Sequence, residues 1–514
     1  MAQATLAGLG RAEAQQDPAR NALIDAAGAL SYAELDRRAN QVAAALVAAG
    51  VQPADRIAIL ADSSAQFYEI CIGAARAGVV PVPINARLSL TEVAAIIADC
   101  DARCLFFDAR FAPIATALQA DHGFACVIET GAALAAWRAP HAPVDPGGGG
   151  DADAVCVQLY TSGTSGVAKG VQLTNRNLFA FGAAGAADAD SPWDAVTGDT
   201  VSLVTLPHGH IAGLGLVLLG LARGACHILL REFSPAEVGR ALDVHRPDFI
   251  LVVPAMIPLL LALEAETPGR TACLRALTYA GAPIPAELLA RTIAELPHLR
   301  LTQLYGLTET SGPITWLRPE DHRDPTLLGS CGRPVPGAEL IVADSRGDPC
   351  ADGVVGEFWC RSAQVMRGYW RRDDENAAVL TNGWFRTGDV GLRDARGYFF
   401  IVDRKRDMII SGGENIYPGE IERVLRDHPA IADAAVFGVP DARWGEAVRA
   451  AIVTRPGASI TFDGLIDFLR PRLAGFKLPK AIDIVADLPR NPTGKILRRQ
   501  LREPFWRGME RRVS

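Results

Sequence analysis

The sequence has 514 residues, which is too long for one hydrophobic core, so two or more domains are expected. Hydrophobic residues make up 49% of it and charged residues 21%, a balance typical of water-soluble globular proteins. The formal net charge of −7 argues against nonspecific binding to nucleic acid and against a strongly basic membrane-binding surface. Any binding site for phosphate must therefore be a local pocket of positive charge.

The cysteines and the longest apolar segments give no sign of export or of a membrane span. The ten cysteines occur singly, without CxxC repeats, and residues 1–20 lack a basic start followed by an apolar run. This pattern predicts reduced, mostly buried thiols and a cytoplasmic location. The apolar segment at residues 211–222 is too short to cross a membrane, and the one at 249–263 is interrupted by Pro254 and Pro258. Both are expected in the protein core.

The first part of the chain predicts alternating helices and strands. Ser31 and Glu34 fit a capping box at the start of a helix over residues 31–50, and Gly50 suits its C-terminal cap. A strand is expected at residues 56–60, a helix at 65–78 and a strand at 79–82. This order favours parallel α/β architecture. Residues 145–150, an Asp-Pro pair followed by four glycines, predict a linker or mobile loop between subdomains.

A strand at residues 155–159 leads into the segment YTSGTSGVAKG at 160–170. Glycines let successive backbone N–H groups turn toward one point, the hydroxyls add donors, and Lys169 adds a positive charge. The segment therefore predicts a nest for a polyanion, most simply the phosphates of a nucleotide. A flexible surface loop is the alternative, and the spacing is not the Walker pattern, because Gly170 follows the lysine. The predicted nest consists of Thr161, Ser162, Gly163, Thr164, Ser165, Gly166 and Lys169.

Two later segments, YGLTET at residues 305–310 and WFRTGD at 384–389, give the loop a wider context. In this order the three segments resemble the adenylate-forming superfamily of acyl- and aryl-CoA synthetases, stand-alone adenylation domains and beetle luciferases. One departure is Ala168, where the family usually has proline. The resemblance covers nearly the whole chain and implies an α/β fold with a large N-terminal domain of layered α/β subdomains at residues 1–403. A small mobile α+β domain would follow at 407–514, with a hinge around 404–406.

The resemblance also implies which residues bind ATP. Tyr305 would stack on the adenine, Thr308 would bond a phosphate oxygen, and Glu309 would hold Mg²⁺, which prefers carboxylate oxygens. Asp389 and Arg404 would contact the ribose hydroxyls. Further contacts to the nucleotide would come from Gly306 and from the tight turn formed by Gly281, Ala282 and Pro283.

The catalytic and acyl-binding residues follow from the same resemblance. Lys495, in the segment PRNPTGK at 489–495, matches the catalytic lysine of the family. His210 matches a histidine at the carboxylate end of the acyl pocket, and a hydrogen-bonded core histidine is the alternative. Gly209 stands where the family usually has an aromatic residue, which predicts a wider or deeper pocket lined by His208, Gly209 and Gly306. A metal role for His208 and His210 is disfavoured by their apolar surroundings.

The resemblance also implies roles for residues near the domain boundary, in domain rotation and in binding of coenzyme A. Arg406 aligns with the hinge position, about which the C-terminal domain would rotate. After this rotation, Ser411, Gly412 and Gly413 would approach the pantetheine arm of coenzyme A.

Together these expectations describe an ATP-dependent carboxylic acid–CoA ligase. It would form acyl-AMP and pyrophosphate, then acyl-CoA and AMP, with Mg²⁺ as its metal ion. Leu304 stands where members acting on small dicarboxylates tend to have arginine, which favours an apolar medium-chain or aromatic monocarboxylate. The expected partners are the acid, ATP and coenzyme A, without nucleic acid or a membrane span. The sequence does not fix the oligomeric state, and a homodimer is compatible with it.

Three alternative functions remain. A stand-alone adenylation enzyme would load a carrier protein, although the segment after Lys495 is too short for a carrier domain and residues 207–210 offer no aspartate for an amino group. A luciferase-like oxygenase would add oxygen chemistry to the same adenylation step. A non-catalytic nucleotide-binding protein would have no need of Lys169, Glu309 and Lys495 together.

Overall fold

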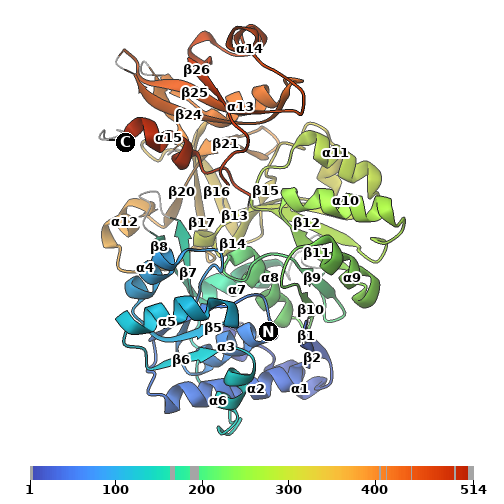
Figure 1. Cartoon of the computed structure of the whole chain (residues 1–514), viewed down its shortest axis with the longest axis vertical. Helices are drawn as coiled ribbons and strands as arrows, with labels where there is room; N and C mark the ends of the chain where they lie inside the picture. The colour runs from blue at the N-terminus through green and yellow to red at the C-terminus, as the bar shows by residue number, and fades with distance from the viewer. Residues whose placement is uncertain are drawn as a thin grey trace. The chain divides into compact units, whose positions relative to one another are not determined.

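The computed structural model describes residues 4–162, 168–185, 196–404, 407–411, 414–441, 443–490 and 494–507. The chain divides into two compact units, of which the first comprises Met1–Leu340 and Cys360–Phe385, and the second Ile341–Trp359 and Arg386–Ser514 (Figure 1). This division differs from the predicted boundary around residues 404–406, of which 405 and 406 lie outside the described part of the chain. The hinge therefore stays a prediction.

A four-stranded parallel sheet lies in the N-terminal part of the first unit, in the order β4-β3-β5-β6. Alternate side chains of the central strand point to opposite faces, as the pleat requires. Ile57 and Ile59 pack in the core that contains helices α2 and α3, whereas Ala58 and Leu60 pack with α4 and α5. The bounds are β3 Arg56–Leu60, β4 Val80–Pro83, β5 Ala102–Phe107, β6 Cys126–Glu129, α1 Arg11–Gln16, α2 Tyr32–Ala48, α3 Ala65–Arg76, α4 Leu90–Cys100, α5 Ala112–Asp121 and α6 Ala132–Arg138.

The predicted parallel α/β architecture is confirmed in this region, and its helix caps are partly as expected. The Oγ of Ser31 accepts a hydrogen bond from the Glu34 amide at 3.3 Å, so it caps α2. The Glu34 carboxylate is instead bound to Arg37 and Arg38, so the reciprocal half of the capping box is not made. Gly50 follows the helix with a φ of +78°, a conformation that glycine adopts without strain.

The largest sheet of the described residues has nine strands, in the order β15-β14-β13-β12-β11-β9-β10-β1-β2. All neighbours from β13 to β1 are parallel. Helices α9, α10 and α11 share one core with this sheet, and α8 packs in another (Figure 1). The bounds are β1 Asn21–Asp25, β2 Gly28–Ser31, β9 Val201–Val204, β10 Cys226–Leu229, β11 Phe249–Val252, β12 Ala276–Ala280, β13 Arg300–Leu307, β14 Gly312–Leu317, β15 Arg333–Pro334, α8 Ile211–Leu221, α9 Pro235–His245, α10 Ile257–Glu266 and α11 Ala286–Glu295.

A small antiparallel sheet joins distant parts of the first unit. Strand β8 (Ala168–Thr174) lies between β7 (Val155–Ser162) and the two-residue β18 (Gly368–Tyr369). Helix α7 (Asn175–Gly185) follows β8, and the short helix α12 (Asp373–Val379) follows β18. The chain thus places the end of the predicted phosphate loop beside a segment that lies about two hundred positions later.

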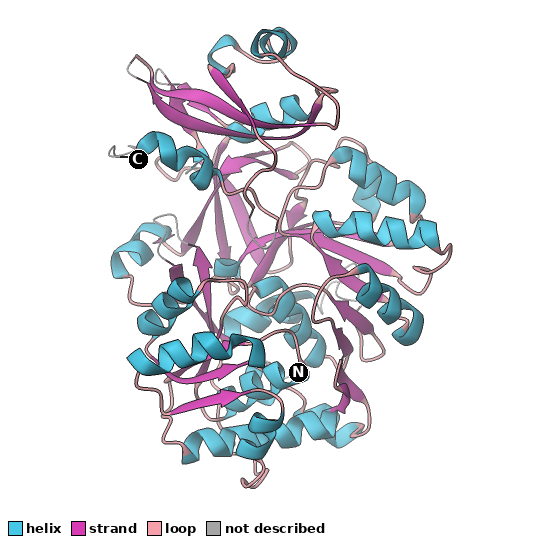
Figure 2. Cartoon of the chain, viewed as in Figure 1, coloured by secondary structure: helices cyan, strands magenta, loops and turns pink. Residues whose placement is uncertain are grey.

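The second unit contains a compact α+β module, as predicted for the C-terminal part. Its sheet has the order β23-β22-β25-β24, with β26 beside β25, and α13 and α14 share its core (Figure 2). A second sheet of order β16-β17-β20-β19, with β21 beside β20, contains the points at which the chain passes between the units. The bounds are β16 Ala338–Ala343, β17 Gly356–Ser362, β19 Leu380–Thr381, β20 Trp384–Arg393, β21 Phe399–Arg404, β22 Ile409–Ser411, β23 Glu414–Ile416, β24 Ile431–Asp441, β25 Gly445–Thr454, β26 Ala481–Ile484, α13 Pro418–Arg426, α14 Phe462–Leu469 and α15 Arg498–Trp506.

The glycine run at residues 147–150 has a packing role that its composition did not reveal. A Cβ at Gly148 would lie 2.5 Å from the carbonyl oxygen of Arg76, and one at Gly149 would lie 2.5 Å from that of Ala75. The chain therefore passes directly against the end of α3, where only glycine fits. Close approach of two backbones therefore explains Gly148 and Gly149.

The two long apolar segments and the cysteines lie mostly inside the protein. Residues 211–222 contain the whole of α8, and residues 249–263 contain β11 and part of α10. Across the described part of the chain, no helix has the length and hydropathy needed to span a bilayer. All ten cysteines are free thiols, six of them buried and four partly buried. Among the described residues, no group of three or more His, Cys, Asp or Glu side chains could hold a metal ion.

Candidate active site

Three of the predicted site segments lie at the carboxyl edge of the nine-stranded sheet. Residues 205–210 follow β9, residues 281–283 follow β12, and residues 305–307 form the end of β13. These strands are parallel, and β11 lies between β9 and β12. In open α/β sheets, ligands bind outside the carboxyl ends of the strands. The fold therefore brings together segments that are about a hundred residues apart in sequence.

Glu309 is held on a short 3₁₀ turn, Thr308–Thr310, directly after β13. The Thr310 hydroxyl accepts a hydrogen bond from the Leu307 amide at 2.9 Å, and it lies 2.7 Å from the carbonyl oxygen of Gly312. The amide of Met366 donates to the Glu309 carbonyl at 2.8 Å. Thr308 and Glu309 are themselves only partly buried. The turn is fixed by buried contacts while the carboxylate remains accessible.

Position 306 requires glycine because the backbone of the neighbouring strand, β14, leaves no room for a side chain. The pairing of β13 with β14 shifts register between Tyr305 and Gly306, and a Cβ at Gly306 would lie 2.0 Å from the carbonyl oxygen of Gly312. Any side chain there would force the two strands apart. Tyr305 is half-buried at the same irregularity, and Gly306 itself is exposed. The bulge thus ends the regular pairing where the predicted site begins.

Lys169 and Glu309 meet at one side chain that the sequence did not single out, Tyr369. Its hydroxyl donates to Oε1 of Glu309 at 3.0 Å, and the Lys169 ammonium lies 5.1 Å from the centroid of its ring. Burial and the nearby Glu309 carboxylate raise the pKa of Tyr369 far above its usual value, so it stays a hydrogen-bond donor. Lys169 also forms an ion pair with Glu375 of α12. The only sequence signal for Tyr369 is an aromatic pair after a glycine.

The two histidines in the segment after β9 have different surroundings. His210 is the N-terminal cap of α8, is partly buried, and its Nε2 lies 3.4 Å from Nδ2 of Asn85. His208 is 2% exposed and packs against the rings of Phe67 and Tyr68, with centroids 5.2 and 4.9 Å away. Neither nitrogen of His208 has a hydrogen-bond partner among the described residues. His208 is thus a core residue, whereas His210 borders the carboxyl edge.

Gly209 allows a close approach of two chain segments. A Cβ at this position would lie 3.0 Å from the backbone of Asn85 and 3.2 Å from that of Ile84. The space that an aromatic ring would need on this side is therefore filled by backbone. The wider or deeper acyl pocket that the missing ring predicts stays a prediction.

The predicted adenine turn has the backbone that its sequence requires. Gly281 follows β12 with a φ of +85°, a region that side chains rarely adopt, and it is exposed. Ala282 is partly buried and Pro283 exposed. Tyr279, inside β12, is fully buried, and its hydroxyl lies 3.0 Å from Nε2 of His322. The strand anchors the turn, and its small residues leave the backbone accessible to a flat ligand.

The predicted ribose residues lie opposite each other on two neighbouring strands of the second unit. Asp389 of β20 is paired in register with Arg404 of β21. Asp389 is 3% exposed, and its amide donates to the Thr387 hydroxyl, which donates to the carbonyl of Phe358 at 2.8 Å. The side chain of Arg404 lies outside the described part of the structure. The sheet itself therefore determines the spacing of this pair.

Lys495 is presented by a short hairpin. Arg490 and Ile496 form an isolated bridge, and Nη1 of Arg490 donates to the carbonyl oxygen of Gly494 at 2.6 Å. Gly494 has a φ of +80°, and the following lysine is exposed. Among the other predicted residues, Thr161 and Ser411 lie at strand ends. Outside the described residues are Gly163, Thr164, Ser165, Gly166, Arg406, Gly412 and Gly413, together with the side chain of Ser162.

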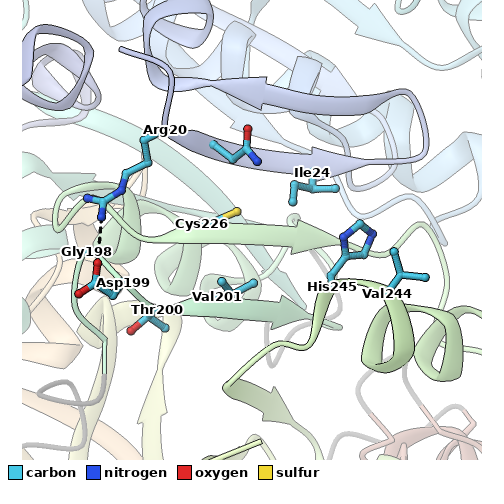
Figure 3. A pocket seen from close by; sticks show the side chains of 10 residues that line it. Arg20, Ile24, Gly198, Asp199, Thr200, Val201, Cys226, Val244 and His245 are labelled. Carbon is cyan, nitrogen blue, oxygen red and sulfur yellow. Dashed lines mark hydrogen bonds and ion pairs between the residues drawn. The ribbon is translucent and has the colours of Figure 1, made fainter. Parts of the chain in front are cut away.

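An open cavity of about 450 Å³ lies elsewhere in the first unit (Figure 3). Most of its lining comes from the amino ends of parallel strands, with Arg20 and Asn21 at β1, Thr200 and Val201 at β9, and Cys226 at β10. No predicted site residue that the structure describes lines it. It lies at the opposite edge of the sheet from the segments described above, so it is not the candidate active site.

Comparisons with known proteins identify the family to which the chain belongs. Residues 10–370 match the AMP-binding enzyme family, and residues 420–495 match the AMP-binding enzyme C-terminal domain. The chain is 39% identical over 507 residues to the fatty acid–[acyl-carrier-protein] ligase ScoC of Streptomyces coeruleorubidus, covering 98% of this chain and 96% of the relative. It is 37% identical over 501 residues to a feruloyl-CoA synthase of Amycolatopsis sp, covering 96% and 97%.

A solved structure gives the same result for the fold. ATP-bound MatB from Rhodopseudomonas palustris superimposes with a TM-score of 0.88 at 31% identity, covering 97% of this chain and 99% of that one. The chain therefore belongs to the AMP-binding enzyme family. The resemblance to adenylate-forming enzymes and the predicted fold class are confirmed.

Proposed function

We propose that the protein is an ATP-dependent carboxylic acid–CoA ligase that works through an acyl-AMP intermediate. The observation that carries the proposal is the convergence of Lys169 and Glu309 on Tyr369 beside the carboxyl end of β13. A cation for phosphate and a carboxylate for a hard metal ion are both needed to hold a triphosphate. The similarity to enzymes named as acid–CoA and acid–carrier-protein ligases supports the same reaction class.

The residues at this position fit a magnesium ion. Glu309 is partly exposed, and among the described residues its carboxylate accepts a hydrogen bond from Tyr369 and forms no ion pair with an arginine. A carboxylate held in this way provides the hard oxygen ligand that Mg²⁺ prefers. Bound Mg²⁺ would offset the negative charge of the phosphates.

In the first step, an oxygen of the substrate carboxylate attacks the α-phosphorus of ATP. The bond between that phosphorus and the bridging oxygen of the β-phosphate breaks, and pyrophosphate leaves. Lys495 would bridge the carboxylate and the α-phosphate, which otherwise repel each other. Thr308 would bond a phosphate oxygen and His210 would lie at the carboxylate end of the acyl group. Catalysis of this step is mostly positioning and electrostatic stabilisation.

In the second step, the thiol of coenzyme A attacks the acyl carbonyl of acyl-AMP, its proton is released, and AMP leaves as the thioester forms. Lys495 would have to withdraw to admit the thiol. Rotation of residues 407–514 about Arg406 would achieve this exchange and would bring Ser411 toward the pantetheine arm. One site would then serve both steps.

We propose an apolar medium-chain or aromatic monocarboxylate as the substrate. Leu304 is 7% exposed in β13, so the position offers no charge for a second carboxylate. Nearly every residue of α8, which starts directly after His210, is buried and apolar. Such surroundings stabilise an uncharged hydrocarbon tail. A cytoplasmic location would supply ATP and coenzyme A, and a homodimer is compatible with this proposal.

A second candidate function is the loading of an acyl-carrier protein. The relative ScoC, which is named for that acceptor, is 39% identical to this chain. Both acceptors present the same pantetheine thiol, so the adenylation step would be unchanged. The two functions differ only in what carries the thiol.

Release of AMP across a panel of medium-chain and aromatic acids tests the proposal. The reaction contains MgATP and is run with coenzyme A, with an acyl-carrier protein, and with neither. We expect AMP release that depends on coenzyme A and on one class of acid. Release only with the carrier protein would establish the second candidate, and no adenylate with any acid would overturn both.

A further inference from the structure

Lys169, the only lysine of the predicted phosphate loop, already has an anionic partner in the protein. Its ammonium forms an ion pair with the carboxylate of Glu375 in α12. The lysine side chain is 12% exposed and the glutamate side chain 37%. The Lys169 ammonium is therefore already paired with a carboxylate of the protein, at the position where it would bind a phosphate oxygen. Even if the ammonium kept both contacts, the negative charge of Glu375 would repel a triphosphate bound there.

The position of Glu375 is fixed by its neighbour in α12. Nδ2 of Asn376 donates to the carbonyl of Tyr369 at 2.9 Å, and the amide of Tyr369 donates to Oδ1 of Asn376 at 2.6 Å. Tyr369 is paired with Val171 of β8, the strand that carries Lys169. Strand and helix are thus connected by backbone pairing and by an amide clamp. The ion pair belongs to a built arrangement and is not a chance contact between two surface side chains.

A second partner for Glu375 lies nearby. Nε of Arg372 is 3.8 Å from Oε1 of Glu375. Nη2 of the same arginine donates to Oδ1 of Asp99 at 2.7 Å, which keeps the guanidinium in place. Glu375 therefore lies between two cations. A small rotation of its side chain would exchange Lys169 for Arg372 without leaving the carboxylate unpaired.

We propose that Glu375 competes with the β- and γ-phosphates of ATP for Lys169 and thereby sets the affinity for the nucleotide. When ATP binds, Glu375 moves to Arg372 and the lysine binds phosphate. When pyrophosphate forms, the return of Glu375 to Lys169 favours its release. AMP has no β- or γ-phosphate, so its affinity does not depend on Glu375. This inference rests on the proposed function, because it takes the bound anion to be the triphosphate of ATP.

Calorimetric titration with MgATP and with AMP tests this role in the full-length chain. Glu375→Gln keeps the shape of the side chain and removes its charge. Asp374→Asn is the matched control, because Asp374 is exposed on the same helix turn and no ion pair or hydrogen bond is found for it in the described structure. Relative to the unmodified protein, we expect Glu375→Gln to bind MgATP about three- to tenfold more tightly, the range of a partly exposed charge contact. Asp374→Asn should change the affinity less than about twofold, as should Glu375→Gln with AMP.

Each outcome decides between the alternatives. If Glu375→Gln binds MgATP no more tightly than Asp374→Asn, Glu375 does not compete for the lysine. If it binds more weakly, Glu375 positions Lys169 for the phosphates and the inference is wrong in sign. Equal tightening for AMP would mean a general charge effect and would also overturn it. If the unmodified protein releases AMP from MgATP but Glu375→Gln and Asp374→Asn have the same affinity for MgATP, only the inference about Glu375 fails. If the unmodified protein binds no MgATP, the proposed function fails as well.

Inhibition of Glu375→Gln by pyrophosphate is a second measurement, and Arg372→Gln is a second variant that tests the same inference. Glu375→Gln should be inhibited by pyrophosphate at about three- to tenfold lower concentration, because without the competing carboxylate pyrophosphate stays bound to Lys169 for longer. Arg372→Gln removes the alternative partner of Glu375, so it should weaken MgATP binding while leaving AMP binding unchanged. If Arg372→Gln leaves MgATP binding unchanged, the exchange of partners is excluded.

Discussion

The two lysines of the candidate site are held in different ways. Lys169 is 12% exposed and contacts Tyr369 and Glu375, both some two hundred positions away in sequence. Lys495 is exposed on a hairpin that is closed by contacts between residues only a few positions apart. The first lysine is held by contacts between distant parts of the chain, and the second by contacts within a short segment of the second unit. This contrast fits a reaction in which one cation stays with the phosphates and the other is withdrawn between two steps.

The sharpest test of the contrast is Lys495→Ala. If Lys495 serves only the first step, this variant should lose about 10²–10³-fold in acyl-AMP formation, the usual cost of removing one transition-state cation. It should still form thioester from supplied acyl-AMP. The two half-reactions are measured separately by ATP–pyrophosphate exchange and by thioester release. Lys480→Ala, which removes another exposed lysine of the same unit, is the control, and equal loss in both half-reactions would contradict the division of roles.

Glu309→Gln tests the Lys169 side of the comparison. Removing the carboxylate charge should raise the Mg²⁺ concentration needed for half-maximal exchange and lower the rate by about 10–100-fold, as one lost metal ligand does. Thioester formation from supplied acyl-AMP, which no longer contains the β- and γ-phosphates, should be affected much less. A variant with an unchanged Mg²⁺ dependence would show that Glu309 is not the metal ligand.

The sequence was more informative about segments than about the contacts between them. The YTSGTSGVAKG loop predicted an anion-binding nest because its glycines and hydroxyl residues are typical of phosphate-binding turns, whereas the YGLTET segment and the predicted adenine turn were assigned by their resemblance to the family. Tyr369 and Glu375 were not predicted, because a tyrosine and a glutamate in a polar segment carry no spacing signal. Their roles depend on the pairing of β18 with β8, a long-range contact that no local pattern encodes. The close contact at Gly209 could not be predicted for the same reason, since its neighbour, the backbone of Asn85, lies far away in sequence.

Acid should weaken the first unit before the second. Burial lowers the pKa of both His208 and His227, in the first unit, to about 3, against about 6.5 in an unfolded chain. Below pH 6.5 the unfolded chain therefore binds protons that the folded chain does not, and stability falls as the pH decreases. Each imidazole contributes a slope of about 1.4 kcal/mol per pH unit. Hydrogen exchange of peptides at pH 7.5 and pH 5 should show earlier loss of protection around β9 and β10. His227→Leu should reduce the slope, and equal acid sensitivity of both units would contradict this assignment.

The smallest expected effect comes from Tyr369→Phe, which removes only the hydrogen bond to Glu309 and keeps the ring beside Lys169. One hydrogen bond to a charged group contributes about 1.5–3 kcal/mol when buried, and less at this partly exposed carboxylate, so we expect about a three- to tenfold increase in the Mg²⁺ requirement. The affinity for AMP and the thermal stability should change little. Tyr32→Phe removes a buried hydroxyl that donates to the carbonyl oxygen of Ala225 at 2.7 Å, away from Glu309, and is the control. If both variants shift the Mg²⁺ requirement equally, Tyr369 stabilises the sheet in general and does not position the carboxylate. If only Tyr369→Phe does so, then one hydroxyl on a two-residue strand fixes the position of the metal ligand relative to Lys169.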